Sequence, residues 1–204
     1  SAFAHSCNCA FADMGLGLGG DTLKSTAEDL LFNRALPLNS YKTSRFTLDK
    51  DSPNALVMQT SIGQGNTLVS PMHMALISSA IANDGVLMKP TMIDKIVNNS
   101  GDTVRETEKT EYKRLMTRNE ANILGKLMKN VVENGTASAL NGRGYTVAGK
   151  TGSAEFDENG SSHSWFVGYS NVDDPDIAIA VIVENGGTGS EAAVPIAANV
   201  FDAY

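Results

Sequence analysis

The string Gly149-Lys-Thr-Gly-Ser-Ala154 brings together groups that can bind an anionic ligand. Lys150 carries an ammonium group, and Thr151 and Ser153 carry hydroxyls. Gly152 leaves the backbone open to the close approach of a ligand. These groups suit a ligand that bears a carboxylate, whereas the Gly-x4-Gly-Lys spacing of a phosphate-binding loop is absent. From these residues alone, a solvated lysine on an edge strand is the alternative.

A second string, Ser6-Cys7-Asn8, combines a hydroxyl with an amide that can both donate and accept hydrogen bonds. The same pattern recurs at Ser52-Pro53-Asn54, so the string identifies nothing by itself, and its polar side chains could simply bond within a helix. Cys7 and Cys9 form no disulfide framework. Together with His5 they offer too few ligands for a metal ion, so no metal site is expected.

Helix signals precede strand signals along the chain. Capping patterns at 25–28, 70–71 and 117–120 each predict the start of a helix, and the pattern of 191–201 indicates a terminal helix. Three apolar segments then predict an antiparallel meander: 146–153, 164–169 and 177–184. A weaker hairpin is expected at 93–104. The sequence predicts an α/β fold of the α+β type, in which helices pack on an antiparallel sheet.

Composition excludes several classes of protein. The chain has 204 residues, of which 42% are hydrophobic, so it can bury a core and is not disordered. Its net charge is −7, whereas binding to nucleic acid requires a cationic surface. The longest aliphatic run, Ile177–Val183, is far too short to cross a bilayer.

Taken together, the strings resemble the transpeptidase domain of class B penicillin-binding proteins. The two short motifs match the Ser-x-Asn and Lys-Thr-Gly members of the motif set of penicillin-binding proteins and serine β-lactamases. Five longer strings agree with these domains, in the right order: Thr60-Ser-Ile-Gly-Gln-Gly65, Val69-Ser-Pro-Met-His-Met-Ala75, Ala80-Ile-Ala-Asn-Asp-Gly85, Gly149-Lys-Thr-Gly-Ser-Ala-Glu155 and Ser164-Trp-Phe-Val-Gly-Tyr169.

The resemblance implies acyl transfer from D-alanyl-D-alanine stem peptides of peptidoglycan, with covalent inhibition by β-lactam antibiotics and no cofactor. It assigns catalytic roles to Ser6, which relays the proton towards the leaving amine, and to Lys150, which holds the Ser6 hydroxyl and raises the local positive potential. It assigns substrate binding to four further residues: Asn8, Thr151, Gly152 and Ser153. It also implies a location on the outer face of the cytoplasmic membrane.

One departure is large, because the chain contains no Ser-x-x-Lys, the motif that supplies the family's nucleophile and general base. Residues 1–204 are therefore expected to be a partial transpeptidase domain that begins inside a larger protein and lacks the upstream segment. The fragment is expected to pair its open sheet with that segment or to self-associate. Two alternatives stay open: a β-lactamase or β-lactam sensor of the same fold, and a non-catalytic interaction module.

Overall fold

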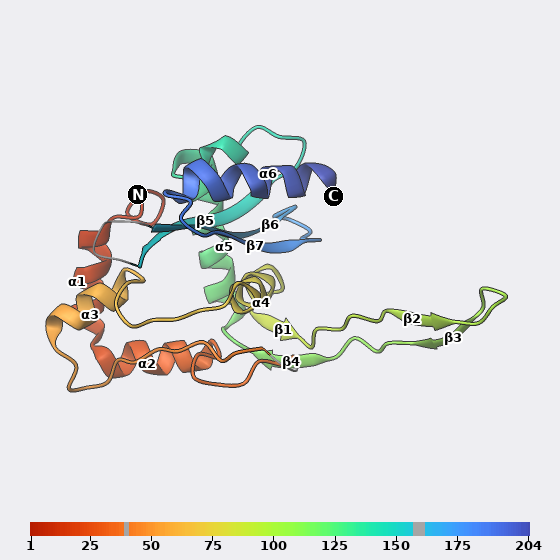
Figure 1. Cartoon of the computed structure of the whole chain (residues 1–204), viewed down its shortest axis with the longest axis horizontal. Coiled ribbons are helices and arrows are strands. Elements are labelled where there is room, and N and C mark those ends of the chain that lie inside the picture. Colours follow the sequence, from red (N-terminus) through yellow and green to blue (C-terminus); the bar gives the residue numbers. More distant parts are fainter. Residues whose placement is uncertain (39–40, 157–161) are drawn as a thin grey trace.

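A three-stranded antiparallel sheet forms the centre of the part of the molecule that carries the two termini (Figure 1). The computed structural model describes residues 1–38, 41–156 and 162–204. The strands are β5 (Val147–Glu155), β6 (Ser162–Ser170) and β7 (Ala178–Val183), in that spatial order. The expected meander is therefore confirmed, and β6 is its central strand. The loop expected between β5 and β6 lies mostly outside the described residues.

Helices cover both faces of this sheet (Figure 1). Helix α6 (Val194–Ala203) packs on one face, after a π-helical turn at Gly189–Ala193. Helices α4 (Pro71–Ala82) and α5 (Arg118–Asn134) contact the sheet as well, α4 at β6 and β7 and α5 at β5. The core beneath α6 is centred on Phe166, which is fully buried and packs edge-on against Phe201. This packing holds β5 and β6 in place.

Three further helices form the other side of the molecule: α1 (Asn8–Leu18), α2 (Gly20–Asp29) and α3 (Asn54–Ser61). Two antiparallel ribbons extend from α4 and α5. The inner ribbon pairs β1 (Val86–Met88) with β4 (Glu111–Arg114), and the outer one pairs β2 (Lys95–Val97) with β3 (Thr103–Glu106). The outer ribbon is the expected hairpin, and it projects away from the body (Figure 1). Among the described residues, no helix is both long and apolar enough to span a membrane.

The caps predicted for α4 and α5 are confirmed. Ser70 accepts a hydrogen bond from the backbone of His73, and Pro71 occupies the first turn. Thr117 and Glu120 form a complete capping box. The helix start predicted at Ser25 is wrong, because α2 already begins at Gly20 and ends before the apolar residues that follow it. Leu31 instead packs in a cluster with α4 and β1, so tertiary packing overrides the local cap signal.

His73 is a fully buried connector between α4 and two loops. Its Nδ1 lies 2.7 Å from the hydroxyl of Ser44, and its Nε2 lies 2.7 Å from the carbonyl oxygen of Leu30. A neutral imidazole satisfies both contacts by donating from Nε2 to the carbonyl and accepting at Nδ1 from the hydroxyl. Burial lowers the pKa of His73, although the bond to Leu30 opposes that shift.

We expect the His73→Gln variant to lose the pH dependence of stability that this histidine causes. Because the folded pKa is lowered, the unfolded chain takes up a proton that the folded chain does not. The free energy of unfolding therefore falls as the pH drops below about 6.5, by up to about 1.4 kcal/mol per pH unit. Urea unfolding of both proteins between pH 5 and 8 measures the difference. A slope as steep in His73→Gln as in the wild type would contradict this role, and His5→Gln is the exposed control.

Candidate active site

A hydrogen bond between Lys150 and Ser6 joins the two short motifs, although 144 residues separate them. The ammonium of Lys150 on β5 donates to the hydroxyl oxygen of Ser6. It also donates to the carbonyl oxygen of Thr151 at 2.8 Å. The ring of Phe3 lies beneath it, with its centroid 5.9 Å from Nζ, which adds a cation–π contact. Two residues to which the family resemblance assigns catalytic roles are therefore in direct contact.

The ammonium of Lys150 is held by neutral hydrogen-bond acceptors and not by a carboxylate. Within the described residues no carboxylate forms an ion pair with it, since the observed salt bridges all involve other side chains. Burial lowers the pKa of Lys150, because desolvation disfavours the charged form. A hydroxyl and a carbonyl stabilise the ammonium but leave its full positive charge. The positive charge of Lys150 is therefore available to attract an anion.

Ser6 has an unusual backbone conformation for a residue with a side chain, because its φ angle is +51°. The left-handed region is strained for such residues and is often found at functional sites. Hydrogen bonds hold the turn: Ser6 N–H donates to the carbonyl of Phe3, and Cys7 N–H donates to that of Ala2. Helix α1 then begins at Asn8, so the turn places Ser6 immediately before the first turn of the helix.

Two adjoining hollows meet at Lys150 and Ile62. One, of about 190 Å³, is lined by Ser6 and Asn8 together with Phe3, Phe11 and Ser61. The other, of about 230 Å³, runs along β5 beside Thr151, Gly152 and Ser153, and its remaining lining is mostly apolar: Gly63, Val69, Met74, Ala154, Trp165 and Val167. All six residues chosen from the sequence thus line one continuous region.

The hydroxyls of Thr151 and Ser153 are each held by a second group. Thr151 Oγ1 lies 2.5 Å from Oγ1 of Thr136. The backbone N–H of Gly189 donates to Ser153 Oγ at 3.2 Å. In addition, the side-chain amide of Gln64 donates to the carbonyl oxygen of Ser153 at 3.4 Å.

Sequence reasoning did not select Thr136, Gly189 or Gln64. Gln64 falls within one of the strings that carry the family resemblance, but no local pattern assigns it a contact. The contacts of all three depend on segments that are distant in the sequence. The second Ser-x-Asn string lies at the start of α3 and lines neither hollow. In the part of the chain that the structure describes, no three His, Cys, Asp or Glu side chains form a metal-binding group.

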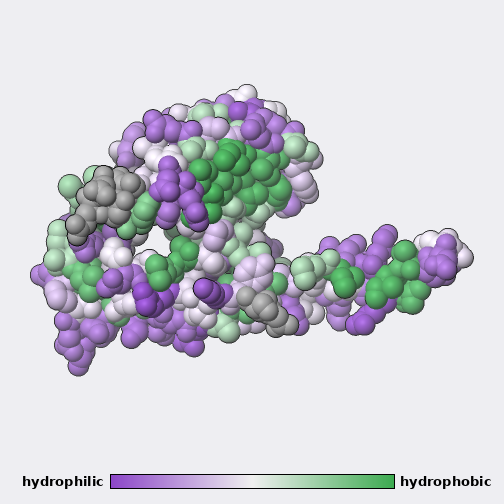
Figure 2. Space-filling view, in the orientation of Figure 1, coloured by the Kyte–Doolittle hydropathy of each residue, from purple (hydrophilic) through white to green (hydrophobic). Residues whose placement is uncertain are grey.

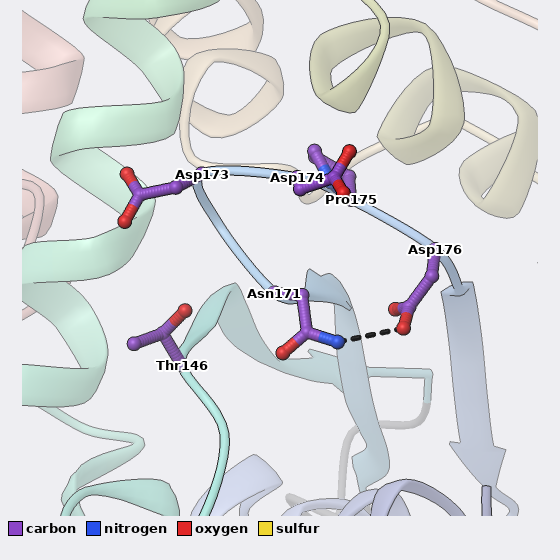
Figure 3. Close-up of a pocket in the computed structure, with 6 residues that line it drawn as sticks. All are labelled: Thr146, Asn171, Asp173, Asp174, Pro175 and Asp176. Carbon is purple, nitrogen blue, oxygen red and sulfur yellow. Dashed lines mark hydrogen bonds between the residues drawn. The ribbon is translucent and has the colours of Figure 1, made fainter.

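A separate pocket of about 400 Å³ lies at the turn between β6 and β7 (Figure 3). Three aspartates line it, of which Asp176 accepts hydrogen bonds from Asn171 and Ser170. These bonds help to lower the pKa of Asp176 against the opposing effect of desolvation. Figure 3 shows the carboxylate of Asp173 pointing away from the bonded pair Asn171 and Asp176. The acidic side chains therefore do not converge on one point.

The site geometry and the fold agree with a known class of enzyme domain. The family model described as "Penicillin binding protein transpeptidase domain" matches residues 1–202. The chain therefore belongs to the penicillin-binding protein transpeptidase family, as the sequence motifs indicated.

Relatives named as a peptidoglycan D,D-transpeptidase and as a penicillin-binding protein support this assignment. The chain is 32% identical to PbpA of Mycolicibacterium smegmatis, over 96% of this chain and 41% of that protein. It is also 32% identical to penicillin-binding protein 3 of Bacillus subtilis, over 91% of this chain and 28% of that protein. The chain thus spans less than half the length of these relatives. Their names favour the transpeptidase interpretation over the β-lactamase alternative.

Solved structures show the same fold. The structure of penicillin-binding protein A from M. tuberculosis as an imipenem acyl-enzyme complex has a TM-score of 0.86 at 28% identity, covering 99% of this chain and 46% of that one. The D,D-transpeptidase domain of a peptidoglycan glycosyltransferase from Eggerthella lenta has a TM-score of 0.85 at 29% identity, covering 98% and 51%.

Gly149, directly before the lysine, is required by core packing. A Cβ atom at this position would lie 2.3 Å from the ring of Phe166. We expect Gly149→Ala to lower the free energy of unfolding by roughly 1–3 kcal/mol, because the buried ring must move. Gly144→Ala is the matched control, since a Cβ there meets no atom within 4 Å. Urea unfolding of both variants measures the costs, and equal costs would contradict the explanation.

Proposed function

We propose that this chain supplies the substrate-binding and proton-transfer part of a peptidoglycan D,D-transpeptidase. The observation that carries the proposal is the half-buried ammonium of Lys150, bonded to Ser6 and paired with no carboxylate of the described residues. The substrates are stem peptides ending in D-alanyl-D-alanine, and β-lactams bind in the same place. Residues 1–204 are a partial domain, and the serine and lysine of a Ser-x-x-Lys motif come from a segment outside them.

In the acylation step, the serine of that segment attacks the carbonyl carbon of the penultimate D-alanine. A serine–acyl bond forms and the peptide C–N bond breaks. The lysine of the same segment takes the proton of the attacking serine. Ser6 gives its own proton to the leaving amine and is reprotonated from that lysine. Lys150 supports this step because it donates to the oxygen of Ser6, so the hydroxyl proton of Ser6 remains available.

The terminal carboxylate of the substrate lies next to Lys150, at the hydroxyls of Thr151 and Ser153. Gly189 can only donate to Ser153 Oγ, so the proton of that hydroxyl is left for a ligand. The backbone N–H of Ser153 contributes to the oxyanion hole. Asn8 binds the amide of the acyl part of the substrate, and Gly152 allows its close approach.

The outer edge of β7 and the surface beside α6 provide the surface for the missing segment. Among the described residues β7 pairs only with β6, and each of its residues is half-buried. A hollow of about 430 Å³ beside it is lined largely by apolar residues, including Ile177, Ile196 and Val200. Figure 2 shows this apolar surface between α6 and β7. The protein lies on the outer face of the cytoplasmic membrane, held there by an anchor outside residues 1–204.

We expect the 204-residue chain alone to form no covalent adduct with penicillin G, because it holds no Ser-x-x-Lys serine. The longer polypeptide that joins it to such a segment is expected to form one adduct on that segment's serine. Mass spectrometry of both proteins after incubation with penicillin G provides the measurement. An adduct on a serine of residues 1–204, or none on the longer polypeptide, would contradict the proposal.

A Lys150→Met variant of the longer polypeptide tests the role of the ammonium. It is expected to acylate at least about 100-fold more slowly, as is typical when a group in a proton-transfer path is lost. Lys126→Met, on the exposed surface of α5, is the matched control and should leave the rate unchanged.

The open edge of β7 leads to a further expectation. An apolar edge with unpaired backbone groups pairs readily with another chain. The 204-residue chain should therefore self-associate at tens of micromolar, and the longer polypeptide should not. Sedimentation velocity of both proteins measures their association. A stable monomer of the 204-residue chain would contradict self-association through the edge of β7.

A further inference from the structure

Thr136 is bonded to both motif segments of the candidate site. It follows α5, and its backbone N–H donates to the carbonyl oxygen of Ala4 at 3.2 Å. Ala4 lies two residues before Ser6. The side-chain Oγ1 of Thr136 lies 2.5 Å from Oγ1 of Thr151 on β5. One half-buried threonine thus connects the turn that carries Ser6 with the strand that carries Lys150.

The end of α5 fixes the position of Thr136. The N–H groups of Gly135 and Ala137 both donate to the carbonyl oxygen of Val131, at 3.0 and 3.2 Å. Ala137 is fully buried. A Cβ at position 135 would lie 2.2 Å from the carbonyl oxygen of Ala4, so a glycine is needed for this close approach. The hydroxyl of Thr136 is therefore presented to β5 from a fixed backbone.

The number of hydroxyl protons determines which of Thr136 and Thr151 donates in this hydrogen bond, once Thr151 binds a carboxylate. Each hydroxyl has one proton to donate and can also accept. If Thr151 donated to Thr136, its only proton would be used within the protein. A carboxylate accepts hydrogen bonds and donates none, so Thr151 can bind one only if its proton points toward the ligand. Thr136 must then be the donor and Thr151 the acceptor.

We propose that Thr136 is a positioning residue for carboxylate recognition, because its hydroxyl donates to Thr151 and directs the proton of Thr151 toward the ligand. This inference rests on the proposed function. Ser153 offers a parallel within the same strand, since the Gly189 N–H can only donate to its oxygen. Both hydroxyls on this edge of β5 are thus set as donors before a ligand arrives. A pre-oriented donor has no alternative partner to give up on binding.

The test compares a ligand that has the carboxylate with one that lacks its charge. The longer polypeptide containing the Ser-x-x-Lys segment is made as wild type, Thr136→Val and Thr136→Ser. The second-order rate constant of acylation is measured with penicillin G and with its methyl ester. We expect Thr136→Val to lower the rate with penicillin G roughly 10-fold or more, as expected for a lost hydrogen bond to a charged group. The rate with the ester should change less than about 2-fold, and Thr136→Ser should restore the rate with penicillin G.

Two controls separate positioning from general damage. Thr146→Val removes a hydroxyl just before β5, where it accepts from the N–H of Val172, and should alter neither rate. Thr136→Ala removes the same hydroxyl in a smaller side chain and carries the comparison if Thr136→Val does not fold.

Equal losses with both ligands, or no loss with either, would overturn the positioning role. A wild-type protein that penicillin G does not acylate would overturn the proposed function and this inference with it. A wild type that is acylated, together with a Thr136→Val variant whose rate loss is no larger with penicillin G than with the ester, would overturn the inference alone.

Discussion

The structure of the site depends on one half-buried positive charge, the ammonium of Lys150. Moving an ammonium out of water is unfavourable unless other groups replace its hydration. Lys150 finds a hydroxyl, a carbonyl oxygen and an aromatic ring, and none of these carries a negative charge. A carboxylate partner would have stabilised the lysine more, but it would also have cancelled the field that attracts an anion. The remaining charge gives the region a positive potential, although the whole chain has a net charge of −7.

This charge is accurately placed because Lys150 stands on β5, which is fixed along one edge by β6 and supported by the core beneath α6. On β5, Thr151 is paired with Phe166 of β6, and Phe166 is fixed in the core beneath α6. The other long edge of β5 has no strand partner among the described residues, so its backbone can meet a ligand. A rigid strand with one paired and one open edge is a good support for a binding site, since the functional groups are positioned without a flexible loop. The turn carrying Ser6 is joined to the same strand through Lys150 and, by way of Thr136, through Thr151.

Much of this arrangement could be predicted from local sequence. The caps of α4 and α5 and the three strands have short-range causes, namely hydrogen bonds within a few residues and short runs of apolar side chains. The pairing of Ser6 with Lys150 could be predicted only through the family resemblance, because nothing local connects residues so far apart. The start of α2 was predicted wrongly, since a capping pattern competed with the packing of Leu31 and lost. Thr136 could not have been selected, because its role depends on the end of α5 meeting two distant segments.

Several features of the site are unfavourable for stability, and the surrounding fold compensates for them. Ser6 has a strained backbone, and Lys150 is charged although partly removed from water. Strain of this kind persists only where neighbouring structure fixes the conformation. The capping box stabilises α5, which Thr136 follows, and the aromatic core beneath α6 supports β5 and β6. The capping box and the aromatic core both lie outside the binding region. The division is physically reasonable, because a ligand that pairs with Lys150 offsets part of the cost of burying its charge. The neutral partners of Lys150 supply no opposite charge, so the electrostatic cost of the half-buried ammonium is borne by the surrounding fold.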